Sequence, residues 1–329
     1  MNIQSEIIEI FENNRGENIS GVFLADKFGI TRSAIWKIIK SLRSQGYLID
    51  AVTNKGYCMK KESNVLSAEG IKINLRGAAI KWNDKIKVYN IIDSTNDCAR
   101  EYARLRTNKG EDGIFIANEQ TKGKGRMGKS FYSPSKTGLY MSILLHKPLM
   151  VEDSLIITSA AAVATVNAIE SVCGIKTQIK WVNDIYIENK KVCGILSEGS
   201  VNMETGQLEY IIIGIGINIF TEDFPDEIKN IAASVLSNDN PTKILRNNLA
   251  AEIINNLILF CEDGIKAEKF MPRYKSLSLV LGKNINVISA GKTEPAFVLD
   301  IDDKAQLIIL DKDKQRKIIN SGEVSIRLS

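Results

Sequence analysis

Apolar residues recur at helical spacing through about the first forty-five positions and then alternate as in a strand. The spacing predicts helices over residues 3–11, 21–28 and 32–45, followed by a β-hairpin over 47–59. The apolar positions that would face inward on the first and third helices are Ile3, Ile7, Ile8, Phe11, Ile35, Ile38, Ile39 and Leu42. Three helices and a short hairpin in this order are typical of a winged helix-turn-helix.

Short polar residues and glycines mark the ends of these elements. Ser20 and Thr31 can cap the second and third helices, because their hydroxyls can accept hydrogen bonds from the first backbone N–H groups. Gly29-Ile30 would form the turn between them, Gly46 would end the third helix, and Asn54-Lys55-Gly56 would form the hairpin tip.

From about Leu66 the pattern changes to strands that alternate with helices. We predict strands over 87–92, 114–117, 139–145, 178–181 and 208–219, with helices over 95–106 and 155–172. Asp93-Ser94-Thr95-Asn96 would cap the first of these helices, and Glu188-Asn189-Lys190 would form a hairpin turn. Mostly adjacent strands with flanking helices favour an α+β sheet domain.

The final fifty residues, from Leu279, alternate with a period of two. Turn residues at Ala290-Gly291-Lys292 and Asp302-Asp303-Lys304 separate the strands. This pattern predicts a small β-barrel, which an ion pair between Glu323 and Arg327 would help to dock onto the preceding domain.

Composition describes an ordinary globular chain of 329 residues, 44% hydrophobic and 25% charged, with a net charge of +4. Its five cysteines are widely spaced and form no CxxC motif, which argues against a disulfide framework and a zinc site and favours reduced thiols in the cytoplasm. The N-terminus has no signal-peptide pattern, and the uncharged segment 154–169 is too short and polar to span a bilayer, so we expect no membrane association.

Charge is concentrated in one region. Residues 20–61 hold eight Lys or Arg and two acids, an excess of six positive charges. The exposed face of the third helix and the hairpin tip supply the candidate DNA-binding residues Arg32, Ser33, Lys37, Lys40 and Lys55. The lysines suit phosphate contacts, because an ammonium group acts as a point charge. A small helical bundle with a solvated basic face is the alternative.

A single histidine, His146, limits the chemistry. Its position at the end of an apolar run suggests a strand terminus, so a Ser-His-Asp hydrolase and a multi-histidine metal site are both disfavoured. Catalysis in this chain should therefore depend on Lys, Arg, Asn and Asp.

The segment Gly123-Lys124-Gly125-Arg126-Met127-Gly128-Lys129 combines glycines with cations, which suits it to wrapping an anion. It matches the dinucleotide-binding spacing, but the residues that follow it have little helical character, so a nicotinamide dehydrogenase fits poorly. A protein-kinase loop fails because no HRD or DFG motif follows. A solvated basic hairpin loop is the structural alternative.

The motifs occur in a specific order along the chain. Behind the winged helix come Ser94-Thr95-Asn96, then Gln120 with the glycine-rich loop, Lys180-Trp181-Val182-Asn183-Asp184, Gly194-Ile195-Leu196 and Gly214-Ile215-Gly216-Ile217-Asn218. In this order the chain resembles the family of bifunctional biotin protein ligases and biotin operon repressors over essentially its whole length. The resemblance implies that ATP activates biotin to biotinyl-5′-adenylate, that a lysine of a biotin carboxyl-carrier protein accepts the acyl group, and that the adenylate promotes a homodimer on operator DNA.

The resemblance also implies the domain organisation and the cofactors. It implies a winged helix-turn-helix over 1–63, a catalytic domain with a mixed sheet like that of class II synthetases over 66–275, and an SH3-like barrel over 279–329. It implies ATP and biotin as ligands, with Mg²⁺ accompanying ATP at residues that the sequence leaves unknown.

By resemblance, the site residues fall into three overlapping groups. The catalytic residues would be Lys180 and Arg126. Those around biotin would be Ser94, Thr95, Asn96, Gln120, Lys124, Gly125, Arg126 and Lys180. Those around ATP and the adenylate would be Gly123, Lys124, Arg126, Lys129, Asn183, Asp184 and Asn218.

Each group has a structural alternative. Ser94 and Thr95 can be helix caps, Asp184 can cap a turn, and Gly214 and Gly216 can simply allow close strand packing. The family's loop often reads Gly-Arg-Gly-Arg-Arg-Gly, so here Lys124 and Met127 replace arginines; Lys124 loses the bidentate fork of arginine, which weakens the expected affinity for the adenylate. A lipoate-type protein ligase and a non-catalytic biotin-sensing repressor are the rival functions.

Overall fold

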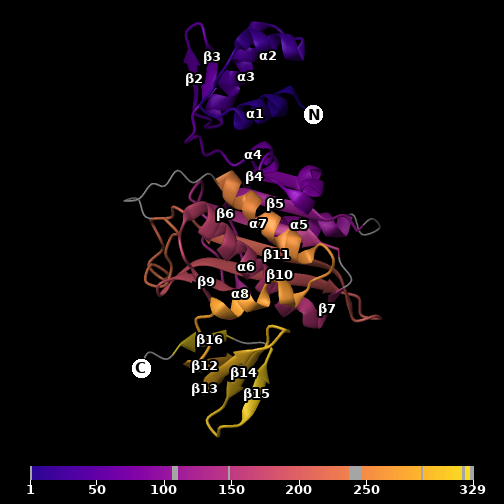
Figure 1. Ribbon diagram of the computed structural model, residues 1–329, viewed down its shortest axis with the longest axis vertical. Helices are drawn as coiled ribbons and strands as arrows, with labels where there is room; N and C mark the ends of the chain where they lie inside the picture. The colour runs from indigo at the N-terminus through magenta and orange to yellow at the C-terminus, as the bar shows by residue number, and fades with distance from the viewer. Residues whose placement is uncertain are drawn as a thin grey trace.

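The computed structural model describes residues 2–105, 110–146, 149–236, 246–289, 292–320 and 323–326. The molecule is elongated, with three parts in chain order: a small N-terminal helical part, a central sheet with helices, and a C-terminal group of strands (Figure 1). The predicted helix end at Arg106, the turn at Ala290-Gly291 and the ion pair of Arg327 lie outside the described residues.

The N-terminal part contains three helices and a three-stranded sheet. The helices are α1 (Ile3–Asn13), α2 (Gly21–Phe28) and α3 (Arg32–Ser44); the strands β1 (Asn18–Ile19), β2 (Ile49–Val52) and β3 (Gly56–Met59) are ordered β1-β3-β2. This confirms the predicted helices and hairpin, whereas β1, only two residues long, carries no periodic signal.

The predicted caps hold these helices at their ends. Ser20 Oγ accepts from the backbone N–H groups of Val22 and Phe23, and Thr31 Oγ1 accepts from Ala34 N. Gly29 adopts the left-handed conformation (φ 63°) that ends α2. Gly56 has a φ of 102° and a Cβ there would lie 2.1 Å from the carbonyl oxygen of Ile19, so the hairpin requires glycine where its tip meets β3.

The central sheet is ordered β4-β5-β6-β11-β10-β9-β8, with β7 paired to β11; β4 and β5 are parallel and the other pairs are antiparallel. Its strands are β4 (Ile86–Ile92), β5 (Gly113–Gln120), β6 (Gly138–Leu145), β7 (Leu149–Met150), β8 (Gln178–Lys180), β9 (Asp184–Ile187), β10 (Lys190–Val201) and β11 (Gln207–Asn218). The second strand was predicted to end at Ala117, but pairing continues to Gln120, so the chain enters the glycine-rich loop directly from the sheet.

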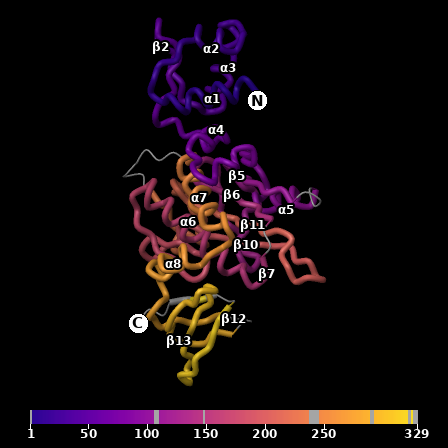
Figure 2. Tube along the Cα trace, turned by 45° about the vertical axis from the view of Figure 1, so that its right-hand side comes forward, coloured from indigo at the N-terminus to yellow at the C-terminus, as the bar shows by residue number. Residues whose placement is uncertain are grey.

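Helices cover the two faces of this sheet unequally. The helices are α4 (Ala68–Lys72), α5 (Thr95–Leu105), α6 (Ser154–Cys173), α7 (Arg246–Cys261) and α8 (Met271–Ser276). Figure 2 shows α6 and α7 on one side of the strands and α5 on the other. The large core lies on the α6 and α7 side, and a small cluster that includes Ala99, Phe115 and Leu144 lies under α5.

The two-residue period of strands assigns each side chain to one of these faces. In β11, Ile211, Ile213, Ile215 and Ile217 join the large core. On the opposite face, Ile212 packs in the small cluster with α5, and the next two positions on that face are glycines. Among the described residues, no helix therefore covers this face of the sheet beyond the N-terminal end of α5, and the motif residues come together there.

α6 is the buried helix that the sequence predicts. The segment Val151–Cys173 is long and apolar enough to cross a membrane, yet 67% of its most apolar window is buried inside the protein. Its apolar character is thus used in packing between the sheet and α7, as in a core helix.

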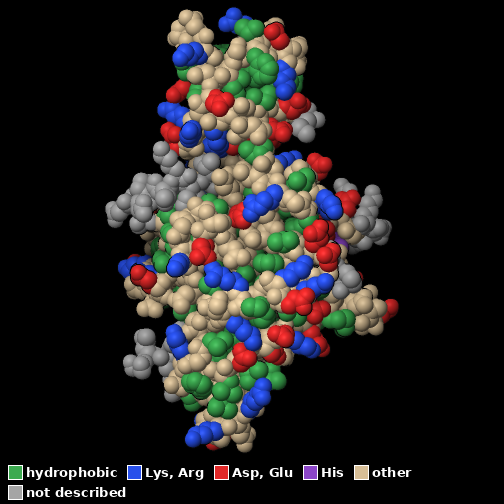
Figure 3. Space-filling view, viewed as in Figure 1, with side chains coloured by type: hydrophobic (Ala, Val, Ile, Leu, Met, Phe, Trp, Pro, Cys, Tyr) green, Lys and Arg blue, Asp and Glu red, His purple; other side chains and the backbone are tan. Residues whose placement is uncertain are grey.

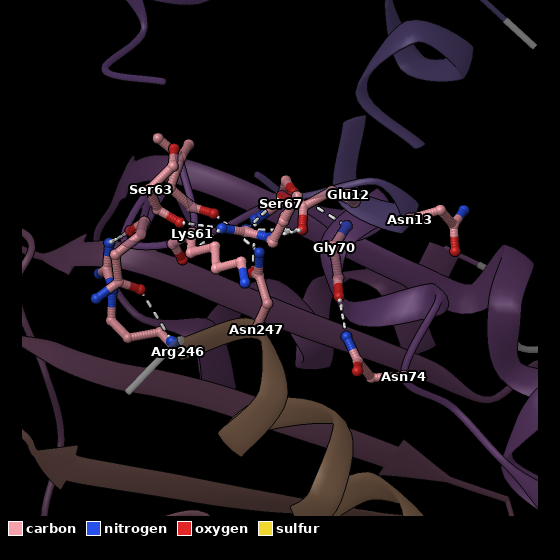
Figure 4. A network of polar contacts seen from close by, with 12 residues as sticks. Glu12, Asn13, Lys61, Ser63, Ser67, Gly70, Asn74, Arg246 and Asn247 are labelled. Atoms are coloured by element: carbon pink, nitrogen blue, oxygen red, sulfur yellow. Dashed lines mark hydrogen bonds and ion pairs between the residues drawn. The ribbon is translucent and has the colours of Figure 1, made fainter. Parts of the chain in front are cut away.

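The start of α7 ties the linker of the winged helix to the sheet (Figure 4). Arg246, 3% exposed, donates from its backbone N to Asn64 Oδ1 and from Nη2 to Asn64 O, both at 2.9 Å, and from Nη1 to Asn118 Oδ1 at 2.7 Å. Asn247 bonds the backbone of Val65 and Ser67. Burial lowers the pKa of Arg246 to about 10. The sequence pattern does not predict this helix, which orients the linker.

The C-terminal part is a five-stranded antiparallel sheet, ordered β15-β14-β13-β12-β16. Its strands are β12 (Asn284–Ser289), β13 (Lys292–Ile301), β14 (Leu307–Leu310), β15 (Arg316–Ile319) and β16 (Glu323–Ile326). The predicted turn at 302–304 joins β13 to β14. Trp181 Nε1 donates to Ala305 O at 2.9 Å, which docks this sheet onto the segment after β8.

Candidate functional site

A cavity of about 280 Å³ opens over the part of the sheet that α5 leaves uncovered. Its floor is lined by Gly194, Gly214 and Gly216 on the paired strands β10 and β11. A Cβ at position 214 would lie 2.2 Å from Asn96 Oδ1, and one at 216 would lie 2.6 Å from the Phe131 ring. These glycines therefore make room for side chains that lie over the sheet, rather than serving close strand packing.

One end of the cavity is lined by polar groups from the start of α5 and the end of β5. Gln120 Oε1 accepts from Thr95 N at 2.8 Å and from Thr95 Oγ1 at 3.0 Å, and Ser94 Oγ accepts from Asp97 N at 3.5 Å. Ser94 is thus a helix cap and also lines the cavity. The residues that cap α5 also form part of the site, because the N-terminus of α5 lies at the cavity wall.

Asn96 is held on both sides. Its Oδ1 lies 2.6 Å from Ser142 Oγ, and its Nδ2 donates to Glu198 at 2.6 Å. Ser142 Oγ also lies 2.7 Å from Thr95 Oγ1. The polar wall is therefore a fixed hydrogen-bonded array, which is what selective recognition of a polar ring requires.

The glycine-rich segment folds as a tight hairpin across the cavity. Phe131 N donates to Gly123 O at 2.9 Å, and Gly125 N donates to Lys129 O at 2.7 Å. Met127 and Gly128 have φ angles of 55° and 73°, which turn the tip. The chain then proceeds to β6 rather than into an α-helix, so the dinucleotide-binding fingerprint is not built here.

The cations of the site come from two directions. Lys124, Arg126 and Lys129 line the cavity from the loop, and Lys180 lines it from the end of β8, with its Nζ 5.6 Å from the Tyr186 ring centre. Arg126 Nη1 donates to Asn183 Oδ1 at 3.0 Å. Positive charge from both walls thus faces one space, which an anionic reaction centre would need.

Three further residues close the opposite end. Asn183 Nδ2 donates to Ile195 O at 2.8 Å, and Asp184 forms an ion pair with Lys191 Nζ at 2.7 Å. Asn218 is 5% exposed and its Oδ1 has no hydrogen-bond partner. A buried acceptor of this kind is costly unless a ligand or water satisfies it, so Asn218 has capacity to bind.

The structure brings nearly the whole predicted set to this cavity. The lining residues among those predicted are Ser94, Thr95, Asn96, Gln120, Lys124, Gly125, Arg126, Lys129, Lys180, Asn183, Asp184 and Asn218. Gly123 lies at the base of the loop, where a Cβ would meet Phe131 O at 2.4 Å. Phe131 and Lys191 also line the cavity but belong to no motif, so the sequence does not predict them. The place of Lys191 follows from the pairing of β9 with β10.

Within the described part of the chain, no three His, Cys, Asp or Glu residues gather as metal ligands. Asp184 and the unsatisfied Asn218 Oδ1 are hard oxygen donors at the same end of the cavity. They fit a Mg²⁺ ion that is bound mainly through nucleotide phosphates, since Mg²⁺ commonly takes few protein ligands.

The candidate DNA-binding residues lie on the winged helix. Arg32, Ser33 and Lys55 line a groove between α3 and the β2–β3 hairpin, whereas Lys37 and Lys40 are exposed further along α3. Trp36, which the sequence analysis did not select, is 51% exposed in the same groove. Figure 3 shows Lys and Arg interspersed with Asp and Glu over the central part of the visible face, in contrast with the basic excess of residues 20–61.

Comparisons with known proteins agree with this arrangement. Residues 88–218 match the model of the biotin/lipoate A/B protein ligase family, and residues 3–58 match a helix-turn-helix domain. A solved relative is the biotin protein ligase from Aquifex aeolicus in complex with biotin and ATP. It is 27% identical, with a TM-score of 0.61, and the match covers 74% of this chain and 99% of that one.

Curated relatives extend the match to the whole chain. The bifunctional ligase/repressor BirA of Bacillus spizizenii is 34% identical over 327 residues, covering 97% of each chain, and that of Escherichia coli is 28% identical over 95% of this chain and 94% of its own. Because the match includes both the winged helix and the sheet with its cavity, the chain belongs to the family of bifunctional biotin protein ligases and repressors.

Proposed function

We propose that the cavity activates biotin with ATP and transfers it to a carrier protein. In the first step a biotin carboxylate oxygen attacks the α-phosphorus, the bond to the β-phosphate oxygen breaks, and pyrophosphate leaves. In the second step a carrier lysine amine attacks the acyl carbon, AMP leaves, and the amine loses a proton. The observation that carries the proposal is one cavity with a polar array at one end and, beside it, cations that come from both the loop and the sheet.

Lys180 and Arg126 are the residues that we assign to the reacting centre. A carboxylate approaching a phosphate brings two anions together, and a unit positive charge at 4 Å offsets about 4 kcal/mol at an effective dielectric of about 20. Lys180 projects from the sheet and Arg126 from the loop, so the two can approach the anions from opposite sides. The loop also limits the access of water to the mixed anhydride.

The remaining residues divide between the two substrates. Ser94, Thr95, Asn96 and Gln120 form the polar array for the ureido ring, and the backbone of Gly125 allows close approach of the ligand. Asn183, Asp184 and Asn218, with Lys129 and the loop base at Gly123, would contact ATP. Mg²⁺ would enter with the phosphates at Asp184 and Asn218.

Pyrophosphate release measures the first step directly. The wild-type chain, with ATP, should release pyrophosphate when biotin is added and should not do so with lipoate in its place. Release with lipoate instead would favour a lipoate-type ligase. Binding of biotin without any release would favour a non-catalytic biotin-sensing repressor.

On operator DNA, Lys37→Ala should weaken binding to all sequences about equally. An exposed lysine that contacts phosphate releases about one counterion, so the slope of log affinity against log salt should fall by about 1. Electrophoretic mobility shifts over a salt series measure both effects. Lys229→Ala, which removes an exposed lysine outside the winged helix, is the matched control, and an unchanged slope for Lys37→Ala would place that residue outside the DNA interface.

The adenylate would serve as corepressor in this scheme. Ordering of the loop around it would favour a homodimer through the central sheet, which places two winged helices on a palindromic operator. The apo carrier protein would compete with dimer formation. Sedimentation with and without biotin plus ATP tests the dimer.

We extend the proposal to the domain level as well. The winged helix would comprise residues 1–63, the ligase domain 66–275 with a sheet of the class II synthetase type, and an SH3-like barrel 279–329. The five antiparallel strands of the last segment form a sheet of their own, and Trp181 docks that sheet onto the segment after β8. Free cysteines among the described residues fit a reducing cytoplasm.

A further inference from the structure

The glycine-rich loop is tied to the protein on both sides of the cavity. Arg126 Nη1 bonds Asn183 Oδ1 in the connection between β8 and β9. Lys124 Nζ lies 2.6 Å from Asp97 Oδ1 on α5, and both residues are about two-fifths exposed. The loop therefore spans the cavity from the sheet to α5, with one cation fixing each side.

Asp97 is itself held in place by a charged network. Arg100 Nη1 donates to Asp97 Oδ1, and Arg100 Nη2 lies 2.8 Å from Glu198 Oε1. Glu198 in turn accepts from Asn96 Nδ2 at 2.6 Å. The carboxylate that receives Lys124 is thus connected to the polar wall of the cavity and presents a prepared anchor.

We propose that Asp97 is a positioning residue for the ligase reaction: through Lys124 it holds the loop of residues 123–131 closed over the cavity while the adenylate awaits the carrier lysine. The inference rests on the proposed function. It assigns Lys124 to a latch on α5, because its ammonium group forms an ion pair with Asp97. Arg126 keeps its place at the reacting centre.

The electrostatics of Asp97 suit this role. Burial raises the pKa of Asp97, but hydrogen bonds and charge from Lys124 and Arg100 outweigh it and hold the pKa below the ordinary 3.8. The carboxylate is therefore ionised at neutral pH. A half-exposed ion pair stabilises a closed loop only modestly, which leaves the loop able to open for the carrier protein.

The latch acts on how long the adenylate stays bound, not on how it forms. Labelled adenylate is formed on the wild-type chain from biotin and ATP, excess unlabelled biotin is added, and loss of bound label is followed by rapid filtration. Asp97→Asn should release the label about fivefold faster, as expected for an ion pair worth about 1 kcal/mol, while single-turnover formation at saturating substrates changes by less than about twofold.

The second arm is a double-mutant cycle with Lys124→Met. If Lys124 acts through Asp97, the two single variants and the double variant release label at about the same rate. If Lys124 instead binds the adenylate directly, Lys124→Met slows formation and its effect adds to that of Asp97→Asn, which overturns the proposal. Lys124→Met also breaks the ion pair from the loop side if Asp97→Asn does not fold.

Asp50→Asn provides the matched control, because it removes an exposed carboxylate from another Asp–Lys ion pair, at 3.5 Å from Lys60 in the winged helix, which does not line the cavity. Release from this variant should equal that of the wild type. If the wild type retains labelled adenylate and Asp97→Asn releases it at the wild-type rate, the latch is contradicted and the proposed function is not. If the wild type accumulates no labelled adenylate, the proposed function is contradicted.

Discussion

Replacing Lys180 by methionine is expected to reduce biotin-dependent pyrophosphate release by about 100- to 1,000-fold. The variant removes a cation worth about 4 kcal/mol at the meeting point of two anions, and each 1.4 kcal/mol is a factor of ten in rate. Methionine keeps the length of the side chain, so the end of β8 retains its packing. The rate is measured at saturating ATP and biotin, together with the affinity for biotin.

The effect should appear in the rate rather than in binding. Biotin itself contacts mainly the polar wall in this proposal, so its affinity should fall much less than the turnover number. Lys190→Met removes an exposed lysine at the hairpin turn between β9 and β10 and should leave both quantities unchanged. If Lys180→Met retains near wild-type release, the assignment of the reacting centre to the end of β8 is wrong.

Local signals predicted the winged helix well because each of its boundaries is set by nearby residues. Ser20 and Thr31 cap the helices whose first turns they adjoin, and Gly29 ends α2 where a left-handed residue is needed. Five strands of the central sheet are also predicted, since buried runs such as Leu139–Leu145 are continuous and apolar. The strands β7, β9 and β10 have no predicted range, although the turn between β9 and β10 is predicted, and the extension of β5 to Gln120 depends on its pairing with β4.

The motif residues of the site could be predicted, but their partners could not. Lys180 and Arg126 stand in recognisable motifs, whereas the contacts of Asp97 with Lys124 and of Asp184 with Lys191 depend on which elements become neighbours. Periodicity predicts which face a residue occupies and gives no information about the element across from it.

α7 also could not be predicted from the periodicity of the sequence. It is buried nearly all round, so it lacks the amphipathic pattern that marks a surface helix. Arg246 at its first position was consequently not recognised as a buried link between the linker at Asn64 and the sheet at Asn118. The carbonyl oxygen of Asn64 and the Asn118 side chain accept from its two terminal nitrogens, which offsets part of the cost of burying this charge.

A methyl group on the cavity floor should weaken biotin binding by about 10- to 100-fold. In Gly214→Ala the new Cβ would lie 2.2 Å from Asn96 Oδ1. Asn96 cannot move without losing its hydrogen bonds to Ser142 and Glu198. Each bond contributes roughly 1 kcal/mol, and the bond to Glu198 contributes more because that acceptor is charged. Isothermal titration with biotin measures the loss.

Gly174→Ala separates this effect from a general loss of stability. Gly174 ends α6 with a φ of 69° and has open space around its Cβ position, so alanine there costs about 1 kcal/mol of folding free energy without reaching the cavity. Its melting temperature should fall while its affinity for biotin stays at the wild-type value. Wild-type affinity in Gly214→Ala would instead mean that Asn96 does not face biotin, and the polar wall would need another ligand.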